Sequence, residues 1–76
     1  MKFQVEFTDT FGGEANYSWV KRRELDIDKP VSDRELMRQA KAALDLTGLR
    51  GRTSKYGDMI EFRPYGCCTV MFITWE

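Results

Sequence analysis

The side chains that most often catalyse reactions or bind metals are scarce in this chain, which contains no histidine. Histidine is a frequent general base and the commonest metal ligand, so its absence removes most nucleophile–base pairs and many metal sites. Cys67 and Cys68 are adjacent and lack the Cys-x-x-Cys spacing of redox and zinc sites. Asp26 and Asp28 are close in sequence but belong to no cleft-forming motif. We therefore expect no enzymatic activity, no metal site and no cofactor.

The same cysteines bear on the compartment in which the protein works. Neighbouring residues of a strand point to opposite faces, so an ordinary Cys67–Cys68 disulfide is not expected, and two buried thiols on a strand are the simpler interpretation. The chain does not begin like a signal peptide, and no apolar run approaches the roughly 20 residues that span a bilayer. We expect a cytoplasmic protein with no membrane segment.

Length and charge limit the classes of protein further. The chain has 76 residues, which form a single domain over 1–76, with 12 basic and 12 acidic side chains. A neutral domain lacks the broad positive field that drives unspecific binding to nucleic acids or membranes. Local charged patches remain compatible with this balance.

The strongest local signal is a helix over residues 32–48. Ser32 precedes Glu35 by three positions, as in a capping box, where each side chain is expected to bond the other residue's amide. Pro30 stands before this start, and Gly48 occupies the position expected for a left-handed C-terminal cap. An apolar stripe at helical spacing joins the two ends: Leu36, Ala40, Ala43, Leu44 and Thr47, with Met37 at its edge.

Four other segments have the alternation or composition of strands: residues 2–9, 17–27, 58–64 and 68–75. Residues 9–16 contain Gly12 and Gly13 and predict a hairpin connection, and the basic run 21–23 suggests a bulge in the second strand. Residues 49–57 carry little apolar content and are predicted as a loop. The expected fold is α+β, in the order β-β-α-β-β, with a four-stranded antiparallel sheet and the helix across one face.

The last segment is apolar on both faces, which predicts a central strand. A single helix covers only one face of a sheet, so an apolar set on the other face would mark an interface, with a homodimer as the simplest partner. Curvature of the sheet and loop side chains offer another way to cover it. The residues expected on this oligomer face are Met59, Met71, Ile73 and Trp75.

Basic residues cluster locally and aromatic residues accompany some of them. Such a combination can hold single-stranded nucleic acid, but it can also be a solvated face, and the zero net charge favours the latter. Against a protein partner, arginine and tyrosine are typical of interface hot spots. The basic clusters are residues 21–23, the helix face Arg34, Arg38 and Lys41, and the loop Arg50, Arg52 and Lys55; the aromatic residues nearby are Tyr17, Trp19 and Tyr56.

Residues 8–20 (TDTFGGEANYSWV) and 53–66 (TSKYGDMIEFRPYG) resemble small proteins encoded by bacteriophages and prophages, over nearly the whole chain. In particular, the sequence resembles anti-CRISPR inhibitors of the type I-C effector complex, Cascade. The resemblance implies a non-enzymatic protein in the cytoplasm of an infected bacterial host, which occupies a Cascade subunit and blocks target DNA binding. It supplies no binding residues of its own.

Three functions therefore stay open: an inhibitor that binds protein, a small nucleic-acid-binding module, and a self-assembling structural protein. A neutral chain argues against wholesale DNA mimicry, although a local acidic patch of Glu14, Glu24, Asp26 and Asp28 could approach a DNA-binding groove. The residues expected to contact a partner are Glu14, Tyr17, Glu24, Asp26, Asp28, Arg50, Arg52, Lys55 and Tyr56.

Overall fold

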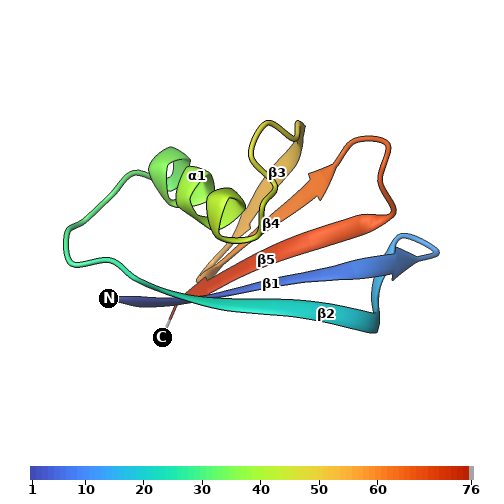
Figure 1. Ribbon diagram of the computed structural model, residues 1–76, viewed down its shortest axis with the longest axis horizontal. Helices are drawn as coiled ribbons and strands as arrows, with labels where there is room; N and C mark the ends of the chain where they lie inside the picture. Colours follow the sequence, from blue (N-terminus) through green and yellow to red (C-terminus); the bar gives the residue numbers. More distant parts are fainter. Residues whose placement is uncertain (76) are drawn as a thin grey trace.

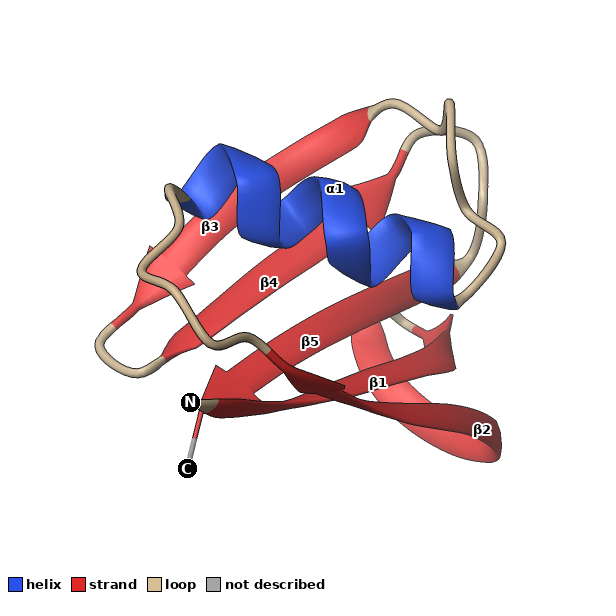
Figure 2. Ribbon diagram, turned by 60° about the vertical axis from the view of Figure 1, so that its left-hand side comes forward, coloured by secondary structure: helices blue, strands red, loops and turns tan. Residues whose placement is uncertain are grey.

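The chain folds into one antiparallel sheet with a helix across one face, in a computed structural model that describes residues 1–75 (Figure 1). Five strands follow the spatial order β2-β1-β5-β4-β3, and Figure 2 shows α1 lying over the sheet. The elements are β1 (Lys2–Phe11), β2 (Glu14–Asp26), α1 (Asp33–Ala43), β3 (Gly51–Tyr56), β4 (Met59–Pro64) and β5 (Thr69–Trp75). The predicted α+β class and the central position of the last strand are confirmed.

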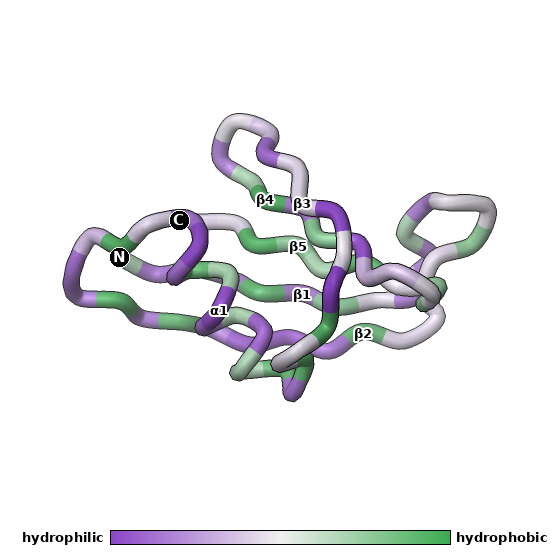
Figure 3. The backbone as a smooth tube through the Cα atoms, turned by 90° about the horizontal axis from the view of Figure 1, so that it is seen from above, coloured by the Kyte–Doolittle hydropathy of each residue, from purple (hydrophilic) through white to green (hydrophobic). Residues whose placement is uncertain are grey.

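Alternation along β1 explains why one face of this strand is buried beneath the helix. Phe3, Val5 and Phe7 point toward the helix and are buried, while the polar residues between them point away; the tube in Figure 3 changes colour accordingly. The three residues pair across the strands with Trp75, Ile73 and Met71 of β5. Both strands thus contribute side chains to one core beneath the helix, which is completed by Ile60, Phe62, Leu36, Ala40, Leu44 and Leu46.

The helix begins where the capping box predicts and ends earlier than expected. The Ser32 hydroxyl accepts a hydrogen bond from the Glu35 amide at 3.1 Å, but the Glu35 carboxylate accepts from the Arg38 guanidinium instead of the Ser32 amide. The expected cap at Gly48 is wrong. Asp45 takes the left-handed position with φ 58°, and the Leu46 amide donates to the Lys41 carbonyl at 2.7 Å, which closes a Schellman motif.

The predicted loop over residues 49–57 is wrong, because Gly51–Tyr56 forms the edge strand β3. Its residues pair with β4 from Gly51↔Pro64 to Tyr56↔Met59. An edge strand needs no apolar face, and the polar composition of β3 therefore carried no strand signal. The sheet therefore has five strands rather than four.

The predicted oligomer face is also wrong for three of its four residues. Met71 and Ile73 are fully buried in the core beneath the helix, and Trp75 packs against the same core. Met59 alone belongs to the opposite, open face, since its neighbour Ile60 points toward the helix. Because β5 is apolar on both sides, its sequence could not show which set faces the helix.

The open face is polar where the sequence predicted an apolar interface. Glu6 and Glu61 flank Phe72 across the strands and form ion pairs with Arg22 at 2.7 Å and Arg63 at 3.3 Å. The charged rows on either side of a half-buried Phe72 let this face meet water.

Candidate functional site

A bulge in β2 is built around the carboxylate of Asp9. The pairing shifts between Thr8↔Val20 and Thr10↔Ala15, so Asp9 alone stands opposite residues 16–19. One Asp9 oxygen accepts from the Ser18 amide at 3.0 Å, and the other accepts from the Ser18 hydroxyl and from the Asn16 side-chain amide at 3.0 Å. These donors, Ser18 above all and then Asn16, lower the pKa of Asp9 to about 2.

Thr8 closes the bulge from the open face of the sheet. Its hydroxyl donates to the Trp19 carbonyl at 2.8 Å and accepts from the Tyr17 amide at 3.1 Å, and the residue is completely buried. Val70, its partner across the strands, is buried to the same extent on the same face. The bulge is thus fixed by side chains of the neighbouring strand. The predicted bulge at 21–23 is wrong, because those residues pair in register with β1.

The bulge holds Tyr17 in a strained backbone conformation. Its φ of 55° lies in the left-handed region, which bulky residues rarely adopt. Such strain costs on the order of 1–3 kcal/mol and persists only where the surrounding bonds enforce it. Here the enforced result is a tyrosine side chain that remains 49% exposed.

Three further aromatic side chains are exposed at the same end of the sheet. Phe11 is 80% exposed, Tyr65 70% and Trp19 40%, the last with its ring 5.3 Å from that of buried Phe7. The β1–β2 and β4–β5 connections lie together at this end in Figure 1, tied by hydrogen bonds from the Thr10 amide to the Cys68 carbonyl and from Arg63 to the Gly13 carbonyl. We call Phe11, Tyr17, Trp19 and Tyr65 the aromatic end.

The expected acidic patch is not formed. Glu14 begins β2 at the aromatic end, whereas Glu24 and Asp26 stand at the opposite end of this long strand and Asp28 lies beyond it. Glu24 lies 3.9 Å from the Lys2 amine, and Asp26 lies 3.8 Å from the N-terminal amine. Separation and nearby positive charge leave these four carboxylates without a shared surface.

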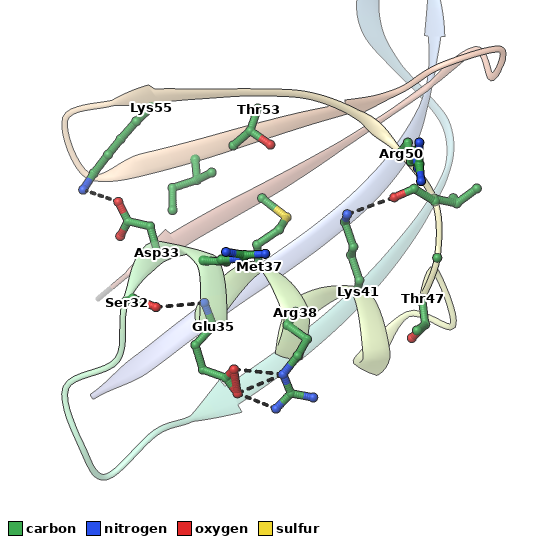
Figure 4. A pocket seen from close by; sticks show the side chains of 14 residues that line it. Ser32, Asp33, Glu35, Met37, Arg38, Lys41, Thr47, Arg50, Thr53 and Lys55 are labelled. Carbon is green, nitrogen blue, oxygen red and sulfur yellow. Dashed lines mark hydrogen bonds and ion pairs between the residues drawn. The ribbon is translucent and has the colours of Figure 1, made fainter.

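The basic residues of the helix and of the segment that follows it come together instead. Arg50 and Lys55 line a groove between α1 and β3 (Figure 4), and the helix residues Arg34, Arg38 and Lys41 line it as well. Arg52 points to the open face, because it alternates with Thr53, which lines the groove. Tyr56 is exposed at the β3–β4 turn, and the 21–23 cluster lies on the distant edge strand β2.

Sequence reasoning missed Asp9, Phe11 and Tyr65 as site residues. Each of the two aromatic residues directly precedes a glycine turn, a place where a large apolar side chain has no core to enter, and this signal was readable. The role of Asp9 depends on partners from the next strand and had no local signal. Cys67 and Cys68 are exposed free thiols in the β4–β5 turn, so their expected burial in a strand is wrong.

No family model, curated protein or solved structure matches the chain. Among residues 1–75, histidine, cysteine and carboxylate side chains form no group that could hold a metal ion. The same residues include no helix long and apolar enough to cross a membrane.

Proposed function

We propose that this protein is a phage-encoded inhibitor that binds a subunit of a type I CRISPR effector complex through its aromatic end and blocks target DNA binding. The mechanism is non-enzymatic occupancy of a protein surface. The resemblance to phage proteins supports the biological setting, and the two segments that carry it, residues 8–20 and 53–66, include all four residues of the aromatic end.

The observation that carries the proposal is the enforced exposure of Tyr17. Because its backbone is strained and its ring is exposed, Tyr17 contributes little to the stability of the isolated chain, whereas an exposed ring held in one place is suited to contact with a partner. Tyrosine and tryptophan dominate binding hot spots because they bury much area for little lost side-chain freedom. The Asp9 bonds fix the backbone before binding, which reduces the ordering cost on association.

The direct test uses the tagged protein and a type I-C effector in lysate, with and without nuclease, followed by target DNA binding with the purified effector. A stoichiometric effector band that survives nuclease, together with loss of DNA binding, is the expected result. Recovery of nucleic acid alone would overturn the proposal in favour of a nucleic-acid-binding module. Recovery of the tagged protein with nothing else would equally overturn it.

The Tyr17→Asn variant separates binding from folding, because asparagine tolerates the left-handed backbone and removes the aromatic ring. We expect about thirtyfold weaker effector binding, the scale of a hot-spot residue. We also expect unchanged or slightly raised thermal stability, since strain is relieved. Tyr56→Asn is the matched control, because Tyr56 is similarly exposed but lies at the β3–β4 turn. Full inhibition by Tyr17→Asn would contradict the assignment of the aromatic end.

A further inference from the structure

The groove between α1 and β3 exists because the helix stops short of the edge strand. Leu36, Ala40 and Leu44 pack over the core side chains of β1, β4 and β5. The β3 residues that face the helix, Thr53 and Lys55, are polar and exposed and give it no apolar surface to cover. A groove of about 860 Å³ therefore remains open beside the helix (Figure 4).

The groove has an apolar floor and a basic rim. Met37, Leu49 and Ile60 contribute apolar surface, and the rim is formed by five cations: Arg34, Arg38, Lys41, Arg50 and Lys55. Among the residues that the structure describes, two acidic side chains line the groove. Each is already engaged, Asp33 with Lys55 at 2.9 Å and Glu35 with Arg38 at 2.8 Å.

Three cations remain to balance an incoming charge. The Lys41 amine donates to the Leu49 carbonyl at 2.9 Å and lies 4.2 Å from the centre of the Phe62 ring, which leaves its charge uncompensated. Arg34 and Arg50 form no ion pair within residues 1–75, and both are exposed. The groove therefore favours an occupant that carries negative charge together with apolar groups.

The outer edge of β3 adds backbone hydrogen-bonding groups to this site. The Tyr65 amide donates to the Arg50 carbonyl at 2.9 Å, and in an antiparallel pair every second residue faces the partner strand in this way. The peptide groups of Gly51, Thr53 and Lys55 consequently point away from β4, to the free edge of the sheet. The side chains of Thr53 and Lys55 line the groove.

We propose that this edge and groove bind an extended acidic segment of a partner protein. The segment adds a strand beside β3 and turns one face toward the groove. Every second side chain lies on that face, where carboxylates approach Arg34 and Arg50 and an apolar side chain between these carboxylates covers the floor. Nucleic acid fits less well, because no aromatic residue lines the groove to stack a base. The inference stands independently of the function proposed for the aromatic end.

The test is fluorescence anisotropy with a labelled peptide of about ten residues, long enough to span β3. Every second residue of the peptide is glutamate except for one central valine, and the residues between them are threonine, so that glutamates and valine share one face of the strand. The comparison probes are the same peptide with glutamine for glutamate and an oligothymidylate of similar length. We expect the glutamate peptide to bind about tenfold or more tightly than the glutamine peptide. Equal binding of the two peptides, tighter binding of the oligothymidylate, or no binding at roughly millimolar peptide would overturn the proposal.

Two variants locate the site on the protein. The double variant Arg34→Glu with Arg50→Glu should weaken peptide binding about tenfold or more, since it reverses both uncompensated rim arginines. The matched control, Lys21→Glu with Arg23→Glu, makes an equal change of charge on the distant strand β2 and should bind the peptide as the unaltered protein does. Equal losses of peptide binding in both double variants would show that the change of net charge alone causes the effect. That result would overturn the proposed site.

Thr53→Pro tests the added strand, because proline removes an amide that faces the free edge and is not needed for pairing with β4. We expect a normal circular dichroism spectrum and loss of peptide binding. Unchanged peptide binding would overturn the strand addition. Hydrogen exchange in the unaltered protein gives a second measurement: the Thr53 and Lys55 amides should become protected when peptide is added, and unchanged exchange would contradict the proposal.

Discussion

The aromatic end and the α1–β3 groove present opposite kinds of surface on one neutral chain. At the aromatic end, hydrogen bonds that Asp9 accepts, and those that Thr8 donates and accepts, fix the backbone, and the exposed side chains are uncharged rings. In the groove, cations on long flexible side chains surround an apolar floor. The first surface is suited to recognition by shape and the second to recognition by charge. A net charge of zero, taken alone, conceals both.

Both surfaces arise at an edge strand, where few side chains are packed in the core. β2 bulges away from β1 near the hairpin, and the apolar stripe of the helix does not cover β3. The central strands β1, β5 and β4 supply most of the buried side chains and have little freedom to vary. Binding chemistry can therefore change at the two edges without cost to the centre.

Removing a central side chain should destabilise the fold on which both surfaces depend, and so destroy both. Ile73 is fully buried in β5, so Ile73→Ala is expected to cost about 2–5 kcal/mol of unfolding free energy. Small domains have roughly 5–15 kcal/mol in total, and this one should lie near the lower limit. Urea unfolding measures the change. Thr74→Ala, on the open face of the same strand, should stay within about 0.5 kcal/mol, and an equal loss in both variants would contradict this account of the core.

Acid should disrupt the bulge that supports the aromatic end. The folded-state pKa of Asp9, about 2, lies below its ordinary value of 3.8, so its contribution to stability is complete above pH 3.8 and disappears as the pH falls through 2. The Ser18 amide resonance should follow this titration in NMR spectra. In Asp9→Asn the titration should be absent and the bulge already altered at neutral pH. A Ser18 titration midpoint near 3.8 would show that the Asp9 bonds do not hold the bulge.

The smallest expected effect is a gain in stability at the C-terminal end of α1, the helix that borders the groove. Asp45 occupies a left-handed position at the negative end of α1, and both features are unfavourable for an aspartate. Asp45→Gly should raise the unfolding free energy by about 0.5–1 kcal/mol. Thermal unfolding measures the gain, and effector binding at the aromatic end should not change. Lower stability would mean that the Asp45 side chain has a role beyond the cap.

The helix and the strand β1 were predictable because their signals are local. Ser32, Glu35 and the apolar stripe act within a few residues of one another, and alternation in β1 reports one buried face. The strand β3 was not predictable, since its residues Arg52 to Lys55 are polar on both faces and pairing with β4 alone defines them as a strand. The face of Ile73 was ambiguous because β5 is apolar on both sides.

The candidate surfaces depended even more on contacts between distant residues. Arg34 and Arg50 were recognised as basic, but only the fold shows that they border the same groove. The role of Asp9 was not predictable, because a carboxylate beside a hairpin usually faces solvent, and its partners Asn16 and Ser18 are defined by the bulge itself. In other sequences, short polar side chains on both sides of a glycine turn are therefore candidates for one hydrogen-bonded set.

The position of β5 in the sheet also determines when the protein can fold. β1 and β5 come from opposite ends of the described chain, and their pairing joins Phe3 to Trp75. Contacts between residues so distant in sequence slow folding, because a long loop must close before they form. While the chain is being synthesised, the N-terminal hairpin and the helix must wait for Thr69–Trp75 to emerge before the core closes. Emergence of β5 from the ribosome is thus the step after which the core of this sheet can close.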